Sequence, residues 1–237
     1  MINLLSRKTL FLVLILFLFF RPGNLYSQHI LGALSAGINL SQVDGDEVYG
    51  FKKVGFNGGP SVIIPFGKEG KWTVTMEILF SMNGSTQKSA DTVQPDSNKP
   101  ASYNGYKLNL NYIQIPLLVH FTDRKIIAGG LGFAYGQLVG VTEWENGHRV
   151  DSTTLQGPYT MADFQVLADV RLRIWKRLWA DVRYSYSIFP IRTRDFTNYT
   201  GTQVWTRKQH NNVISLRLTY IFNDPYVRSR EGKTKKN

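Results

Sequence analysis

The chain has 237 residues, enough for one domain of moderate size, and it contains no cysteine, which excludes a fold held by disulfide bonds. Its formal charge of +11 includes Arg7, Lys8 and Arg21, so the chain without its first 27 residues would carry +8. A net positive charge is common among nucleic-acid-binding proteins. The N-terminal residues described next predict export from the cytoplasm, which argues against a nucleic-acid partner.

The first 27 residues have the pattern of a secretory signal peptide. Arg7 and Lys8 precede an apolar run over 9–20, and Ser27 ends the segment on a small residue. This run is shorter than the ~20 residues that a membrane-spanning helix needs, and an uncleaved anchor helix is the alternative. We therefore expect a signal peptide over 1–27, a mature domain over 28–223 and a basic periplasmic tail over 224–237.

Segments of alternating apolar and polar residues follow along the mature chain, as expected of strands with two unlike faces. There are eight, in chain order 30–41, 53–66, 71–81, 107–122, 126–142, 160–175, 178–189 and 210–222. Most exceed the ~5–6 residues of a typical soluble strand and reach the ~9–11 residues of a tilted transmembrane strand. The pair within 107–142 is separated only by 123–125, which predicts a hairpin.

The connections between these segments alternate strictly in length. Short turns at 67–70, 123–125 and 176–177 alternate with longer polar connections at about 42–52, 83–106, 143–159 and 190–209. Outer-membrane barrels have an even number of strands, short periplasmic turns and longer surface loops. The sequence therefore predicts an all-β fold, an eight-stranded antiparallel transmembrane β-barrel with an up-and-down meander and both chain ends in the periplasm.

Charged residues occupy the polar faces of the predicted strands. They are Glu77, Asp169, Arg171, Arg173, Asp181, Arg183 and Arg217. In a soluble sandwich, the alternative fold, such residues would face water while the apolar faces packed together. In an eight-stranded barrel they point into a lumen only just wide enough for side chains, where charges must be paired. We predict that these seven residues form a salt-bridge network that plugs the lumen, with the small residues of 126–142 giving it room.

Aromatic residues lie near the short turns. Phe66, Trp72, Phe121 and Phe222 share the apolar face, which predicts an aromatic girdle at the membrane interface. Trp175 and Trp179 flank the third turn but share the parity of the lumen charges. Either they cap the periplasmic mouth, or the alternation slips at this turn.

Three stretches carry a resemblance to a known family. Residues 110–119 read LNYIQIPLLV, residues 129–136 read GGLGFAYG, and residues 215–222 read SLRLTYIF. They resemble the PorT-like outer-membrane β-barrel family of Bacteroidota over about 28–223. The resemblance implies a place in the bacterial outer membrane and, for the founding member, a role in type IX secretion and gliding. Phe222 ends the last predicted strand. An aromatic residue at this place resembles the signal that the bacterial barrel-assembly machinery recognises.

No set of residues indicates a catalytic centre. His148, Asp151 and Ser152 have the residue types of outer-membrane hydrolases, but their presence in a polar loop needs no catalysis to explain it. The four histidines lack metal-ligand spacing, and no phosphate-binding loop is present. We expect no catalytic residue, no cofactor and no metal.

These patterns favour a non-enzymatic scaffold or accessory subunit embedded in outer-membrane lipid. Its long surface loops would meet secretion-system or other envelope proteins, with type IX secretion as the most concrete candidate. A small channel or ligand-binding barrel is the alternative, and an outer-membrane enzyme is the third. The tail over 224–237 is either a solvated segment or binds a periplasmic partner or anionic headgroups.

Overall fold

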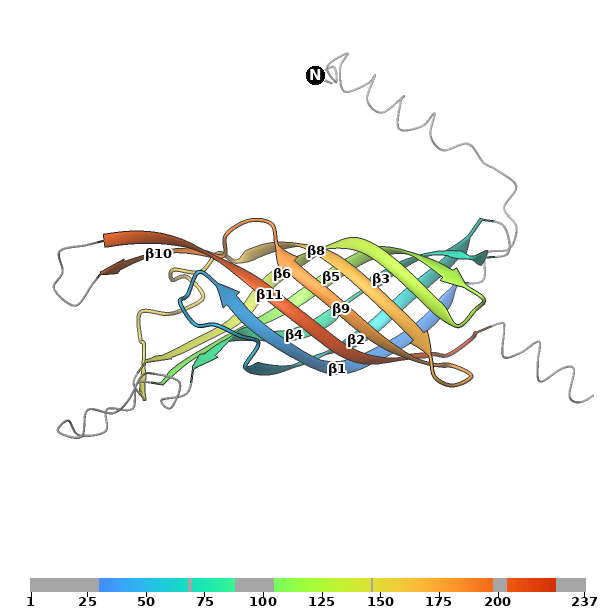
Figure 1. The fold of residues 1–237 in the computed structure, drawn as a ribbon, viewed down its shortest axis with the longest axis horizontal. Coiled ribbons are helices and arrows are strands. Elements are labelled where there is room, and N and C mark those ends of the chain that lie inside the picture. Colours follow the sequence, from blue (N-terminus) through green and yellow to red (C-terminus); the bar gives the residue numbers. More distant parts are fainter. Residues whose placement is uncertain (1–29, 68–69, 88–104, 146, 198–203, 225–237) are drawn as a thin grey trace, which may run out of the picture.

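The computed structural model describes residues 30–67, 70–87, 105–145, 147–197 and 204–224. The predicted signal peptide and all of the predicted tail except Asp224 lie outside these residues. In the described part, tilted antiparallel strands close into a ring of eight (Figure 1). The predicted all-β, eight-stranded barrel is therefore confirmed.

The ring follows the chain in order and closes by pairing its last strand with its first. Its members are β1 (Leu31–Asp44), β2 (Lys53–Phe66), β3 (Trp72–Glu77) with β4 (Leu79–Gln87), β5 (Tyr106–Asp123), β6 (Ile127–Glu145), β8 (Ala162–Arg173), β9 (Leu178–Ser187) and β11 (Val204–Ile221). Two short strands lie outside the ring. They are β7 (His148–Arg149), which pairs with β6, and β10 (Arg192–Thr197), which pairs with β11.

The third strand of the ring is interrupted at Ile78, where the sequence predicts one continuous strand. Its hydrogen bonding resumes with the same offset to β2, because Glu77 pairs with Ser61 and Ser81 pairs with Asn57. The backbones come unusually close here, since a Cβ on Gly59 would lie 2.0 Å from the carbonyl oxygen of Ile78. We therefore treat β3 and β4 as one transmembrane strand.

The predicted surface loops are shorter than the sequence suggests. Strand β4 continues to Gln87, β6 continues to Glu145, and β10 forms a hairpin with the first part of β11 across the predicted loop 190–209. These extensions project beyond the ring (Figure 1). Outside the membrane, water reaches both faces of a strand, so no apolar alternation marks it in the sequence.

The outer wall of the barrel is apolar. Leu131 is 71% exposed, Phe133 is 66% exposed and Val54 is 58% exposed, and all three lie on the outward face of their strands. So large an apolar surface fits a lipid environment and does not fit water. No helix in the described ranges is long and apolar enough to cross a membrane.

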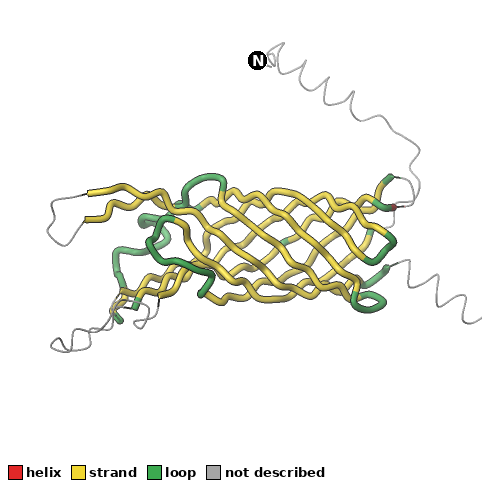
Figure 2. The backbone as a smooth tube through the Cα atoms, in the orientation of Figure 1, coloured by secondary structure: helices red, strands yellow, loops and turns green. Residues whose placement is uncertain are grey.

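The two ends of the barrel differ. The tight turns and both ends of the described chain lie together, and the longer connections lie at the opposite end (Figure 2). By the usual arrangement of outer-membrane barrels, the first end is periplasmic and the second is the cell surface. Near the periplasmic end Trp72 lies 6.3 Å from Phe66 and 5.0 Å from Phe121, measured between ring centroids. This outward-facing group has the position of the predicted girdle.

Candidate functional site

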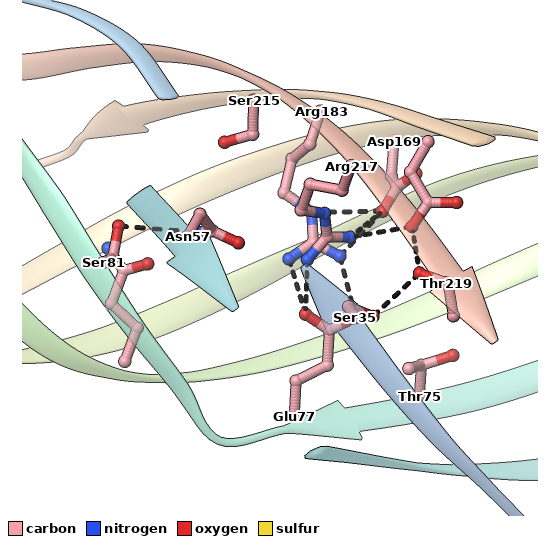
Figure 3. Close-up of polar contacts among 12 residues, drawn as sticks. Ser35, Asn57, Thr75, Glu77, Ser81, Asp169, Arg183, Ser215, Arg217 and Thr219 are labelled. Atoms are coloured by element: carbon pink, nitrogen blue, oxygen red, sulfur yellow. Dashed lines mark hydrogen bonds and ion pairs between the residues drawn. The ribbon is translucent and has the colours of Figure 1, made fainter. Parts of the chain in front are cut away.

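The centre of the lumen is filled by a layer of ion pairs. Glu77, Asp169 and Asp181 meet Arg171, Arg183 and Arg217, and each of these residues is at most 6% exposed. Figure 3 shows four of them, Glu77, Asp169, Arg183 and Arg217. We call these six residues the ion-pair layer. Three carboxylates face three guanidinium groups, so the formal charges of the layer cancel.

Glu77 is the residue that joins the layer across the lumen. Arg183 binds it through two nitrogens, with Nη1 2.7 Å from Oε2 and Nη2 3.0 Å from Oε1. Arg217 Nη1 lies 3.0 Å from Oε2, and Arg171 Nη2 lies 3.1 Å from Oε1. A forked, doubly bonded carboxylate is the strong form of such a pair. Because β3 supplies Glu77 and β8, β9 and β11 supply the arginines, the contacts span the lumen.

The other two carboxylates are paired along the sheet. Asp169 stands opposite Arg183 in the β8–β9 register, and Asp181 stands opposite both Arg171 in β8 and Arg217 in β11. Arg183 Nη2 lies 2.7 Å from Asp169 Oδ2, and Thr219 Oγ1 donates to Asp181 Oδ2 over 2.6 Å. Cross-strand pairs of this kind are the ordinary units of sheet stabilisation. Here the paired side chains are buried, which strengthens the pairs.

Arg173 differs from the sequence prediction. It lies apart from the ion-pair layer, at the periplasmic mouth, where its Nη1 is 2.7 Å from Asp224 Oδ2. Its guanidinium also stacks over the ring of Trp179, with 4.5 Å from Cζ to the ring centroid. Trp179 is buried in the mouth, whereas Trp175 is 71% exposed. The two tryptophans therefore separate, and only Trp179 lines the lumen.

Small residues of β6 stand where the layer needs space. Gly130 pairs with Asp169 and Ala128 pairs with Arg171 in the β6–β8 register. A Cβ on Gly130 would lie 2.3 Å from the ring of His120, which is itself buried and lies 3.6 Å from Asp169. The absence of a side chain at this position therefore leaves room for the histidine beside the layer.

Toward the cell surface the ion-pair layer is followed by amides and hydroxyls. Asn39 donates to Ser81 and to Asn83, each over 2.9 Å, and accepts a hydrogen bond of 2.7 Å from Ser215. The cavity among these residues measures about 10 Å³. That volume is at the lower limit for even one water molecule. This part of the lumen is therefore packed.

An apolar plug follows the amides. It consists of Val43, Leu108, Leu110, Tyr112, Leu138, Tyr159 and Ile191, all at most 3% exposed. Tyr159 and Ile191 come from connections outside the ring and fold over its end, where Thr160 N–H donates to the Ile191 carbonyl over 2.8 Å. Burial raises the pKa of the Tyr159 phenol. The surface end of the lumen is thus closed by apolar side chains.

Glu143 organises the surface connections, although the sequence pattern predicts only a loop at this position. It accepts hydrogen bonds from Thr153 over 2.6 Å, from Tyr106 over 3.2 Å and from Arg192 over 3.2 Å. It points inward because β6 has an extra residue near Val139, which shifts the β5–β6 register and reverses the alternation beyond it. Nothing in a period-two pattern reveals such a bulge.

Another buried acid, Asp46, lies in the connection between β1 and β2. Its Oδ1 accepts the Val48 N–H over 2.8 Å, and burial raises its pKa to about 6.

The three residues with the residue types of outer-membrane hydrolases, His148, Asp151 and Ser152, are all exposed. Among the residues that the structure describes, no group of three or more His, Cys, Asp or Glu side chains is placed to hold a metal ion.

A protein-family model and several solved structures are similar to this chain. Residues 27–192 match the family described as outer membrane protein beta-barrel domain. No curated protein matches the chain. Among solved structures, Ail of Yersinia pestis is 14% identical with a TM-score of 0.43, covering 81% of this chain and 99% of its own. Neisserial surface protein A is 13% identical with a TM-score of 0.43, over 81% and 96%.

A major outer membrane protein of Thermus thermophilus is also similar, at 12% identity and a TM-score of 0.43, over 82% of this chain and 100% of its own. Scores at this level carry no argument about function. The family match spans most of the chain, and the closed ring of eight strands has the architecture that the family's description names. The chain therefore belongs to the outer membrane protein β-barrel domain family and resides in the outer membrane.

Proposed function

We propose that the protein is a non-enzymatic scaffold or accessory subunit. Its ordered structure at the cell surface would bind another protein of the cell envelope. The observation that carries the proposal is the blockage of the lumen from its centre to its surface end. The ion-pair layer, the amides and the apolar plug occupy it in succession, which disfavours transport through the barrel. The surface end is then the part of the molecule free to meet a partner.

The surface structure supports this proposal because it has a defined shape. The β10–β11 hairpin projects beyond the ring and carries stacked rings of Phe196 and Trp205, 6.2 Å apart with an interplanar angle of 16° (Figure 1). Trp205 Nε1 donates to Glu47 over 2.7 Å, which ties the hairpin to the β1–β2 connection. A binding surface that is already ordered loses little conformational entropy on association.

Within this class, we infer that the protein is a PorT-like component of type IX secretion and that its partner is another protein of that system. The support is the resemblance of 110–119, 129–136 and 215–222 to that family. A surface hairpin with basic and aromatic residues suits a protein partner, since Arg and Trp are enriched in protein interfaces.

The test is a surface and secreted proteome from a strain that lacks the gene. We expect cargo of the secretion system to leave the surface and accumulate inside the cell, and the wild-type gene to restore it. A second complementing gene replaces 195–206 by Asn-Gly, which joins the paired residues Arg194 and Arg207 by a two-residue turn. This variant should fold and insert but fail to restore secretion.

Two outcomes would count against the proposal. Intact secretion in the deletion strain contradicts the type IX role. Full complementation by the shortened hairpin contradicts the use of this hairpin as the docking surface. Equal amounts of both proteins in the outer membrane are the control for expression.

A further inference from the structure

At the periplasmic end the lumen is hollow. A cavity of about 590 Å³ opens there and ends blindly near Arg171, a member of the ion-pair layer. We call this cavity the vestibule. Its volume is in the range of ~300–1,000 Å³ found for small-molecule sites. Because the far side of the layer is packed, the vestibule is a pocket and not the entrance of a path.

The wall of the vestibule is apolar. It is formed by Leu31, Ile63, Ala128, Trp179 and Ile221, each at most 7% exposed. These side chains come from β1, β2, β6, β9 and β11, so the apolar surface surrounds the cavity. An apolar wall with a few polar groups is the usual composition of a ligand pocket.

The charged side chains around the vestibule are mostly cationic. Lys71, Arg124, Lys125, Arg171 and Arg173 line it, and Asp224 is the one lining carboxylate. Arg171 is paired within the ion-pair layer, Arg173 with Asp224, and Arg124 lies 3.8 Å from Asp123. Arg171 lies at the inner end, and Arg124 and Lys125 belong to the turn between β5 and β6. A cavity with low-dielectric walls and one dominant sign of charge concentrates the opposite ion. The vestibule thus favours an anion.

A buried donor points to a ligand independently of the charge. Trp179 Nε1 has no hydrogen-bond partner among the described residues, and the indole is 6% exposed and lines the vestibule. A buried N–H without an acceptor destabilises the fold. An acceptor oxygen on a ligand would satisfy it.

We propose that the vestibule binds a small amphiphilic anion, with an apolar body and one carboxylate or phosphate group, from the periplasmic side. The apolar wall receives the body, the cationic side chains attract the head group, and Trp179 Nε1 donates to it. The chain's own tail is disfavoured as occupant, because its residues Arg228, Arg230, Lys233, Lys235 and Lys236 carry the same sign of charge as most charged side chains that line the vestibule. The site lies at the opposite end from the surface hairpin and does not depend on the scaffold role.

The test follows the indole N–H resonance of Trp179 by NMR in the mature chain in lipid nanodiscs, with assignment from Trp179→Phe. The probes are octanoate, octyl phosphate and the neutral octanol. We expect both anions to shift the Trp179 resonance saturably and octanol to bind about tenfold more weakly, because it lacks the charged head group. Trp72, on the lipid-facing wall, reports partition of the probe into lipid.

A matched pair of variants tests the role of charge. Arg124→Glu changes an exposed residue of the vestibule, and Arg177→Glu changes a residue of the neighbouring turn that does not line it. Arg124→Glu should weaken octanoate binding about fivefold, because it reverses one charge beside the proposed position of the head group. Arg177→Glu should change octanoate binding little. Tighter binding of octanoate would identify fatty-acid-like ligands, and tighter binding of octyl phosphate would identify phospholipid-like ones.

Three results would overturn the proposal. One is the absence of a Trp179 shift with either anion. Another is an equal response of Trp72 and Trp179, which means partition into lipid only. The third is a Trp179 shift that appears only when 225–237 are removed, which would make the tail the occupant. None of these results bears on the secretion test of the surface hairpin.

Discussion

Replacement of Arg217 by leucine should lower the free energy of unfolding by about 3–5 kcal/mol, because it leaves a buried carboxylate without its partner. The Arg217 side chain is fully buried and lies 3.0 Å from Glu77, 3.2 Å from Asp181 and 3.4 Å from Asp169. Without it, three carboxylates share two guanidinium groups. Thermal unfolding of the purified barrel in detergent, followed by circular dichroism, measures the loss.

The matched control is Arg207→Leu, which removes an arginine from the exposed part of the same strand. Surface substitutions of this kind usually change stability by no more than about 0.5 kcal/mol. Asp181→Leu should be destabilising like Arg217→Leu, and the double variant should lose less than the sum of the two, because two acids again face two arginines. Additive losses, or a loss from Arg217→Leu no larger than the control, would mean that these side chains are solvated.

Alanine at Gly37 should destabilise the barrel by about 3 kcal/mol. A Cβ at this position would lie 2.1 Å from the Leu216 carbonyl oxygen and 2.6 Å from the Arg217 Cα. Both are backbone atoms, so β1 and β11 would have to move apart at the Gly37–Arg217 pair. Arg217 would then shift within the ion-pair layer. The same thermal unfolding measurement detects the change.

Gly129→Ala serves as its comparison, because a Cβ at Gly129 meets no atom within 4 Å. We expect this variant to melt within about 0.5 kcal/mol of the wild type. Equal melting of the two alanine variants would contradict the close approach of β1 to β11.

Much of the barrel wall could be predicted from the sequence because its two faces meet different surroundings. Lipid outside and charges inside produce a strict alternation, and β2 occupies 53–66 as the alternation indicates. The turn at 176–177 also fixes a register, since a hairpin centred there places Asp169 beside Arg183 and Arg171 beside Asp181. One tight turn thus places four of the six residues of the ion-pair layer.

The remaining contacts depend on closure of the ring. Glu77 is 106 residues from Arg183 in the chain, and no local pattern shows that the two meet. Arg173 has the parity of the lumen charges, but it lies two residues nearer the turn than Arg171, which places it beside Asp224 at the mouth. Parity determines which face a side chain takes, whereas depth along the barrel depends on the strand stagger.

The surface end was the least accessible to sequence reasoning. There, Glu143 faces inward only because of the bulge near Val139, and β10 has no apolar alternation to mark it. Bulges and strands wetted on both faces are set by neighbouring strands, which a single chain pattern does not contain.

Single-channel recording from the purified wild-type protein in planar lipid bilayers shows directly whether the lumen is closed. A lumen filled by the ion-pair layer, the amides and the apolar plug predicts a quiet bilayer, with no discrete current steps under conditions where a porin control conducts. Reproducible steps from the wild-type protein would contradict the account, because they would show that the charged side chains line a water-filled path.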